Sequence, residues 1–235
     1  MKNVFVPALA LVLSCAAAPM FVTAPVLAQP AASASAKGAD PKLTQEVVDK
    51  VQAFYNTSQT FRADFSQKFW VKAYNKEKTS QGSVLFGKPG KMSWTYSSPA
   101  GNRVVSDGSV LKVYEAENKQ MFEQNVDKSQ YPAALAFLTG TGKLTDSFTF
   151  ELFEGEKMGF AGGWVLVGVP KTANAPYSKV LFYVDKASSQ VRRVMIIDQQ
   201  GNRNRFDFSN PKVNETVKPE NFQFTPPPGT TIVKQ

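Results

Sequence analysis

The stretch "GKMSWTYSSP", residues 90–99, alternates apolar and polar side chains. Met92, Trp94 and Tyr96 share one parity, and the residues between them are serine or threonine. Because successive side chains of a strand point to opposite faces, this stretch predicts a strand with one apolar and one polar face. The apolar face belongs either to an ordinary core or to an interior that takes up a ligand.

The stretch "TFRADFSQKFWVKAY", residues 60–74, shows the same period over a greater length. One parity is polar and carries Arg62, Asp64 and Lys68, so we expect one long, half-buried strand. The other parity is apolar and comprises Phe61, Ala63, Phe65, Phe69, Val71 and Ala73.

Period-two alternation continues along most of the remaining chain, so we expect ten or eleven strands of antiparallel type. Asp107-Gly108 is typical of a hairpin turn between two of them. The further strands are expected at Gly82–Phe86, Lys91–Ser97, Arg103–Ser106, Val110–Glu115, Gln120–Gln124, Phe148–Phe153, Trp164–Val169, Lys179–Val184, Val191–Asp198 and Arg203–Phe208, with a last short strand ending in "FQFTPPPG".

Two segments have helical rather than strand spacing. The first begins at Thr44, a predicted N-cap, and its apolar stripe comprises Val47, Val48, Val51, Phe54 and Tyr55. The second is a short helix over Ala133–Leu138, with Pro132 at its start and Gly140 after its end. The chain is therefore mainly β with a few helices, and a sheet curled around those helices would bury every apolar face.

The N-terminus predicts export. Lys2 precedes an apolar run, Val4–Leu13, which is too short to span a bilayer, and Val26–Ala28 resembles a cleavage site. We therefore expect a signal peptide over residues 1–28, a flexible linker rich in Ala, Ser, Pro and Gly over 29–42, and one domain over 43–235. The alternative is a lipoprotein anchored at Cys15, which follows a loose lipobox.

The amino-acid composition excludes the side chains that most enzymes use for catalysis. The chain has no histidine, and cleavage after Ala28 removes its one cysteine, so the usual general base, thiolate nucleophile and zinc ligands are absent. The stretch "GKPGK" lacks the spacing of a phosphate-binding loop. The glutamates at 151, 154 and 156 are typical of the solvent-exposed face of a strand rather than of a catalytic pair. We expect neither an enzyme nor a cofactor.

The charge does not indicate nucleic acid. Cleavage removes Lys2 and no acidic residue, so the net charge of +8 becomes +7. The basic residues are scattered, with no run of five or more, which favours a solvated basic surface over a nucleic-acid site.

Four blocks together resemble the LolA family of periplasmic lipoprotein carriers. They are "FRADFSQ" from Phe61, "FGKPGKMSWTYSSP" from Phe86, "VVSDGSVLKVYE" from Val104 and "NFQFTPPPGTTIV" from Asn221. Their order and spacing are more specific than any one block. The resemblance implies an unclosed antiparallel β-barrel with a helical lid over a hydrophobic cavity.

The resemblance also implies a role. A carrier of this kind takes acylated lipoproteins from an inner-membrane ABC transporter, crosses the periplasm as a monomer, and delivers to a LolB-like acceptor or to the outer membrane itself. The alternative on the same fold is a lipid-sensing or lipoprotein-sensing regulator of the envelope. A sensor usually adds a second domain, and the chain ends soon after the "FTPPPG" block, which favours the carrier.

The expected site depends on the resemblance as well as on strand parity, because parity alone favours a plain core without a cavity. The lid is expected to include Leu135, Phe137 and Leu138. Members of the family carry Arg before the Pro of the turn, where it bonds the lid; here that residue is Lys88, which lacks the bidentate geometry of Arg. The residues expected to line the cavity are Phe65, Phe69, Val71, Phe86, Met92, Trp94, Tyr96, Val113, Phe182 and Val194.

Overall fold

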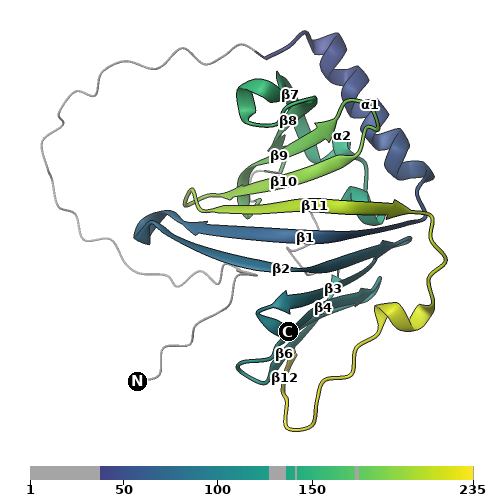
Figure 1. Ribbon diagram of the computed structural model, residues 1–235, viewed down its shortest axis with the longest axis vertical. Coiled ribbons are helices and arrows are strands. Elements are labelled where there is room, and N and C mark those ends of the chain that lie inside the picture. The colour runs from purple at the N-terminus through teal and green to yellow at the C-terminus, as the bar shows by residue number, and fades with distance from the viewer. Residues whose placement is uncertain (1–37, 127–135, 141, 173–174, 235) are drawn as a thin grey trace, which may run out of the picture.

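The computed structural model describes residues 38–126, 136–140, 142–172 and 175–234, which form one curled sheet with helical segments against it (Figure 1). The helical segments are α1 (Pro41–Thr57), η1 (Lys72–Tyr74), η3 (Ala136–Thr139), α2 (Leu144–Ser147), η4 (Gly155–Met158) and η5 (Pro219–Phe222). The strands are β1 (Thr60–Val71), β2 (Lys76–Gly87), β3 (Lys91–Ser98), β4 (Ala100–Asp107), β5 (Val110–Glu115), β6 (Gln120–Asn125), β7 (Phe148–Glu154), β8 (Gly163–Pro170), β9 (Tyr177–Asp185), β10 (Val191–Asp198), β11 (Arg203–Val213) and β12 (Thr231–Lys234).

The sheet is open. Its strand order is β12-β6-β5-β4-β3-β2-β1-β11-β10-β9-β8-β7, so β12 and β7 are the two edges. Neighbouring strands in the described part of the chain are antiparallel, except β12 and β6, which are parallel. The expectation of an unclosed antiparallel barrel is confirmed, with twelve strands in place of ten or eleven.

Helix α1 begins earlier than its apolar pattern predicts. Asp40 is the N-cap, its side chain accepts a hydrogen bond from the Lys42 N–H at 2.8 Å, and Pro41 occupies the first turn. The prediction that Thr44 caps the helix is wrong, because Thr44 lies inside the first turn and its hydroxyl donates to the Asp40 carbonyl. The Ala39 N–H also donates to the Leu152 carbonyl of β7, so the fold takes in residues 38–42, which composition alone assigns to a linker.

Helix α1 buries the stripe that its spacing predicts. Val47, Val48, Val51 and Tyr55 are buried, and Phe54 is half-buried. The helix packs against β7, α2 and η3, and its C-terminus leads directly into β1 (Figure 1). No helix among the described residues combines the length and the apolar character needed to cross a bilayer.

The β1–β2 hairpin is the longest in the sheet, pairing from Thr60 with Gly87 to Val71 with Lys76. The apolar parity of β1 is buried only over its first half, at Phe61, Ala63 and Phe65. Farther along, Phe69 and Val71 are half-buried, and Ala73 is exposed in the turn η1. Parity therefore predicts the face of a side chain but not its depth.

The segment between β6 and α2 is described only from residue 136. Leu135 and the start of the predicted helix Ala133–Leu138 lie outside the described residues. Residues Ala136–Thr139 form a 3₁₀ turn, η3, and the Gly140 N–H bonds to the Phe137 carbonyl at 3.3 Å. Gly140 has a φ of +71°, so it ends this segment as the sequence predicts.

The C-terminal segment differs from its prediction. The stretch "FQFTPPPG" forms no strand; instead η5 packs Phe222 against β2, and Phe224 stacks on Tyr114 of β5 with ring centroids 5.3 Å apart. The last strand, β12, follows at Thr231–Lys234. Because three prolines cannot donate hydrogen bonds to a sheet, the segment between η5 and β12 crosses the outer face of the sheet without joining it.

Candidate functional site

Trp94 lies at the centre of an aromatic cluster on the inner face of the sheet. Its side chain is 0% exposed, and its ring centroid lies 4.9 Å from that of Phe65, 5.3 Å from Phe206 and 5.7 Å from Phe86. Gly82 of β2 makes this packing possible, because a Cβ there would lie 2.9 Å from the Phe65 ring and 2.0 Å from the Thr95 carbonyl oxygen. The alternation quoted from residues 90–99 thus points its apolar face inward.

A second aromatic cluster lies on the other half of the sheet. The ring of Phe182 lies 5.4 Å from Phe137 and 5.6 Å from Phe148, measured between centroids. Tyr55 of α1 connects the clusters, since its centroid lies 5.0 Å from Phe137 and 6.2 Å from Phe61. The inner face is therefore a continuous aromatic surface that runs under α1 and η3.

The structure gathers most of the predicted cavity residues in this interior. Phe65, Phe86, Met92, Trp94, Tyr96, Val113, Phe182 and Val194 are buried in one core cluster with residues of α1 and η3. Phe69 and Val71 are half-buried outside that cluster. Phe137 and Leu138 of the expected lid are buried under α1 in the same cluster.

Sequence reasoning left out several residues that complete this interior. Phe148, Phe206 and Phe208 are buried beside the predicted set, and each lies on the apolar parity of its strand. That parity was the available signal. No sequence signal marked Gln67, because it is a polar residue at a position of β1 whose parity is otherwise apolar. In the structure Gln67 is buried, and its side chain accepts a hydrogen bond from the Tyr96 hydroxyl at 3.3 Å.

The helical segments over the interior are joined to the sheet and to one another by a small set of polar contacts. The Val191 N–H of β10 donates to the Tyr55 hydroxyl at 3.1 Å. The Gly90 N–H donates to the Thr139 carbonyl at 3.0 Å, and the Leu144 N–H donates to the Gln52 side chain at 2.8 Å. The contacts beneath these segments are apolar.

Lys88 makes the most specific of these contacts. Its Nζ donates to the Asn56 carbonyl at 3.0 Å and to the Tyr55 carbonyl, both at the C-terminal end of α1. Carbonyls at a helix C-terminus carry partial negative charge and lack partners within the helix, so a lysine there is favourable. Partial burial lowers the pKa of Lys88 below its ordinary value, and desolvation of the ammonium is the cause.

The side chain of Lys88 crosses Gly140 on its way to α1. A Cβ at Gly140 would lie 2.7 Å from Cε and 2.8 Å from Cδ of Lys88. Lys88 therefore touches α1 and the end of η3 together. We call this end of the sheet, at Thr60 and residues 87–90, the covered end.

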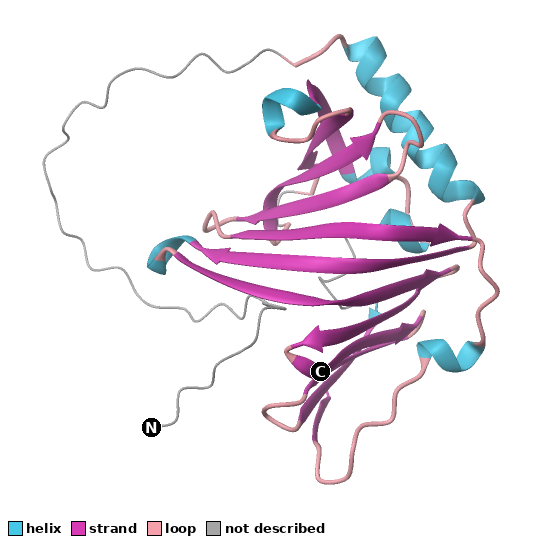
Figure 2. Cartoon of the chain, in the orientation of Figure 1, coloured by secondary structure: helices cyan, strands magenta, loops and turns pink. Residues whose placement is uncertain are grey.

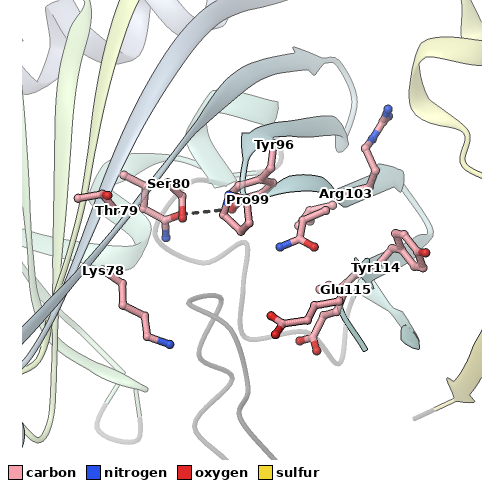
Figure 3. A pocket seen from close by; sticks show the side chains of 13 residues that line it. Lys78, Thr79, Ser80, Tyr96, Pro99, Arg103, Tyr114 and Glu115 are labelled. Carbon is pink, nitrogen blue, oxygen red and sulfur yellow. Dashed lines mark hydrogen bonds between the residues drawn. The ribbon is translucent and has the colours of Figure 1, made fainter. Parts of the chain in front are cut away.

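The opposite end of the strands, at Val71–Lys76, Ser98–Pro99 and Glu115, carries a cavity of about 290 Å³ and is called the open end (Figure 3). Its walls come from β1 to β5, and two predicted cavity residues, Tyr96 and Val113, contribute to them. The lining residues are Gln67, Lys78, Thr79, Ser80, Tyr96, Pro99, Asn102, Arg103, Val104, Val113, Tyr114, Glu115 and Glu117.

Charged and polar groups distinguish this cavity from the aromatic interior. Glu115 is only 6% exposed, and burial raises the pKa of its carboxyl above the ordinary value, while a hydrogen bond from Asn118 at 2.9 Å opposes that shift. Burial likewise raises the pKa of the Tyr96 hydroxyl, which stays neutral. The wall thus combines buried apolar side chains, such as Val104 and Val113, with the buried polar side chains of Gln67, Ser80 and Glu115.

Two observations bear on the chemistry that the interior supports. In the described ranges no three His, Cys, Asp or Glu side chains lie close enough together to hold a metal ion. The indole N–H of Trp94 is buried without a hydrogen-bond partner, which costs about 1–3 kcal/mol in a packed interior. The surface is suited to binding apolar groups, with one unpaired donor at its centre.

Comparison with known proteins gives consistent matches. The family described as "Outer membrane lipoprotein carrier protein LolA" matches residues 56–225. The outer-membrane lipoprotein carrier proteins of Nitrosomonas europaea and Nitrosospira multiformis are 29% and 28% identical over 195 and 191 residues, and each alignment covers 80% of this chain and 88% of the relative. The crystal structure of an uncharacterized conserved protein from Thermus thermophilus is similar in fold, with a TM-score of 0.50 and 14% identity over 82% of this chain and 99% of that one.

Proposed function

Because the chain belongs to the LolA family of outer membrane lipoprotein carrier proteins, we propose that it is a periplasmic chaperone that binds the acyl chains of lipoproteins and carries them from the inner to the outer membrane. One observation carries the proposal. The inner face of the open sheet is a continuous aromatic surface, and a helix and a 3₁₀ turn cover it through a small set of polar contacts.

The energetics of the cargo require such a surface. Each CH₂ moved from hydrocarbon into water costs about 0.8 kcal/mol, so one long acyl chain faces a barrier on the order of 10 kcal/mol. A carrier must offer apolar contacts that replace most of that loss. The residues that pack around Trp94 and Phe182 offer them if the covering segments move aside.

We propose that α1 and η3 are the lid and that Lys88 is its latch. In the structure the side chains of Val51, Tyr55, Phe137 and Leu138 occupy the interior, so cargo must displace them. The cost of opening reduces the apparent affinity and prevents the carrier from holding its cargo too tightly to release it. Lys88 contributes to that cost by bonding α1 while crossing Gly140.

The finer assignments also remain proposals. We propose a cleavable signal peptide over residues 1–28, a single carrier domain that adds residues 38–42 to the expected 43–235, a monomeric state, and no catalytic activity, cofactor or nucleic-acid partner. The expected exchange partners are an inner-membrane lipoprotein-releasing ABC transporter and a LolB-like acceptor or the outer membrane itself. The names of the curated relatives support the carrier over the envelope sensor.

The deciding experiment is mass spectrometry of the molecules that co-purify with the protein from envelope extracts. We expect acylated lipoproteins, and we expect the purified protein to bind a fluorescent fatty-acid probe that an acylated lipoprotein displaces. The same lipoprotein without its acyl chains is the matched control and should not displace the probe. Recovery of no acylated molecule, together with no probe binding, would contradict the proposal.

A further inference from the structure

The tip of the β1–β2 hairpin projects beyond the neighbouring strands at the open end (Figures 1 and 2). We define the basic aromatic tip as residues 68–78 together with Arg203 of β11. The β2–β3 ladder begins only at Gln81 and Ser98, so in the described part of the chain it does not reach residues 76–80 of β2. This segment of the hairpin pairs with β1 and extends past the end of β3.

The tip has a defined conformation. The Trp70 indole N–H donates to the Asn75 side chain at 3.0 Å, and the Arg203 guanidinium lies 5.0 Å from the centroid of the Trp70 ring. The Lys72 N–H donates to the Asn202 side chain at 2.9 Å, which joins the tip to the β10–β11 turn. These contacts fix Trp70 and Arg203 relative to each other and join the backbone of the turn to the β10–β11 turn.

The side chains of the tip are unusual for a solvated turn. Tyr74 is 76% exposed, although the structure buries most other aromatic side chains, and Trp70 is only half-buried. Four lysines and one glutamate lie in residues 68–78, and Arg203 adds a further positive charge. The one acidic group, Glu77, pairs with Lys68 at 3.2 Å.

Edge protection explains only part of this composition. Lysines at 76 and 78 discourage an exposed strand edge from pairing with another chain. That role needs no exposed tyrosine at the turn, no tryptophan stacked under Arg203, and no lysine at 72, which lies in the turn η1 rather than on the edge. An aromatic group among basic ones is instead the composition that binds at a membrane–water interface.

We propose that the basic aromatic tip docks the protein on an anionic lipid surface. Tyr74 and Trp70 would enter the headgroup layer, and Lys72, Lys76 and Arg203 would face the lipid phosphates. Lys78 belongs both to the tip and to the wall of the open-end cavity, so docking would turn that cavity toward the membrane. The proposal goes beyond the acyl-carrier function and does not depend on it, because the tip lies outside the aromatic interior.

The test is co-flotation of the purified exported protein, which lacks residues 1–28, with vesicles of phosphatidylcholine, with or without phosphatidylglycerol. We expect binding only to the anionic vesicles and a steep loss at high salt. Lys72→Gln and Lys76→Gln should each weaken binding about fivefold at low salt, and Tyr74→Ser should weaken it several-fold. Matched controls are Lys212→Gln and Lys234→Gln for exposed charge, and Ile232→Ser for an exposed apolar side chain.

The outcomes separate the tip from the interior. Tip variants should keep the thermal unfolding midpoint and the fatty-acid probe affinity of the parent protein while losing vesicle binding. Equal binding to neutral and anionic vesicles, or equal losses in the tip and control variants, would overturn the proposal. Binding of the tip to soluble polyglutamate without any binding to vesicles would also overturn it and would assign the tip to an acidic protein partner.

Discussion

The covered and open ends of the sheet are built from the same strands but present opposite chemistry. At the covered end, α1 and η3 press apolar side chains onto the aromatic face, and Lys88 bonds across them. At the open end the same strands carry a cavity whose wall includes ionisable side chains, and the hairpin projects as a basic aromatic tip. A single alternating pattern thus serves a core at one end and a surface at the other.

Two tryptophans on central strands of the sheet illustrate the difference between the covered and the open end. Trp94 lies under the covering segments with 0% exposure, whereas Trp70 lies at the open end, half-buried beneath Arg203. Their local sequences, "MSWTY" and "KFWVK", both come from alternating stretches. The two residues differ in face as well as in cover, because Trp94 lies on the apolar parity of β3 and points inward, whereas Trp70 shares the polar parity of β1 with Arg62, Asp64 and Lys68. The energetic comparison of the two ends is therefore tested at these positions.

Trp94→Ala should have the largest effect. Removing this fully buried ring leaves a large cavity in the aromatic cluster, so we expect the free energy of unfolding to fall by about 3–5 kcal/mol. Trp70→Ala should cost about 1 kcal/mol, because its ring is already partly in water. Urea unfolding measures both, and similar losses for the two variants would show that the two ends are not energetically distinct.

Lys88→Met tests the proposed latch. The variant keeps an unbranched apolar side chain but removes the charged donor to the Asn56 and Tyr55 carbonyls. Because Lys88 is partly exposed, we expect the free energy of lid closure to become less favourable by only about 1 kcal/mol. We therefore expect the fatty-acid probe to bind several-fold more tightly and transfer to acceptor vesicles to slow.

Two further variants sharpen that result. Lys88→Arg should favour the closed state through a second parallel hydrogen bond and weaken probe binding several-fold. Lys91→Met removes a nearby, equally half-buried lysine that bonds neither carbonyl, and it should leave affinity unchanged. If Lys88→Met behaves like Lys91→Met, apolar contacts alone hold the lid.

Gly140→Ala should loosen the same end by a smaller amount. The new methyl group would collide with the Lys88 stem at a φ of +71°, so it should displace the latch and tighten probe binding about two- to threefold. Gly159→Ala is the matched control, since its φ is +68° and nothing lies within 4 Å of the added Cβ. An equal change in probe affinity for the two variants would attribute the effect to backbone strain rather than to Lys88.

Glu115→Gln, at the open end, should have the smallest effect. Burial raises the pKa of the Glu115 carboxyl in the folded state above its ordinary value of 4.5. The protonated carboxyl therefore stabilises the folded state fully when the pH is below 4.5, and this contribution is lost as the pH rises through the folded-state pKa. The neutral glutamine should therefore raise the free energy of unfolding at pH 7 by less than about 1 kcal/mol and make no difference well below pH 4.5. Denaturation at both pH values measures this, and a gain that is equal at both would mean that charge is not its cause.

Much of the fold was predictable from local pattern. The bounds of β5 and β10 were predicted to the residue, and the inward face of Met92, Trp94 and Tyr96 follows from alternation alone. The Asp-Gly turn at residue 107 also lies where it was expected, with the Asp107 side chain accepting from the Val110 N–H at 2.9 Å. These features depend on neighbours a few positions away, which the sequence displays directly.

Other features required the tertiary structure. Phe69 has the same parity as Phe65 but is only half-buried and lies outside the core cluster. The reason is that β1 extends past α1 and η3, which cover only its first half. The partner of Lys88 could not be read from its neighbours, since the carbonyl of Asn56 lies 32 positions earlier and meets it only when α1 folds back over the sheet. Periodicity determines which face a side chain takes; how deep it lies and what it bonds depend on segments that only the folded chain brings together.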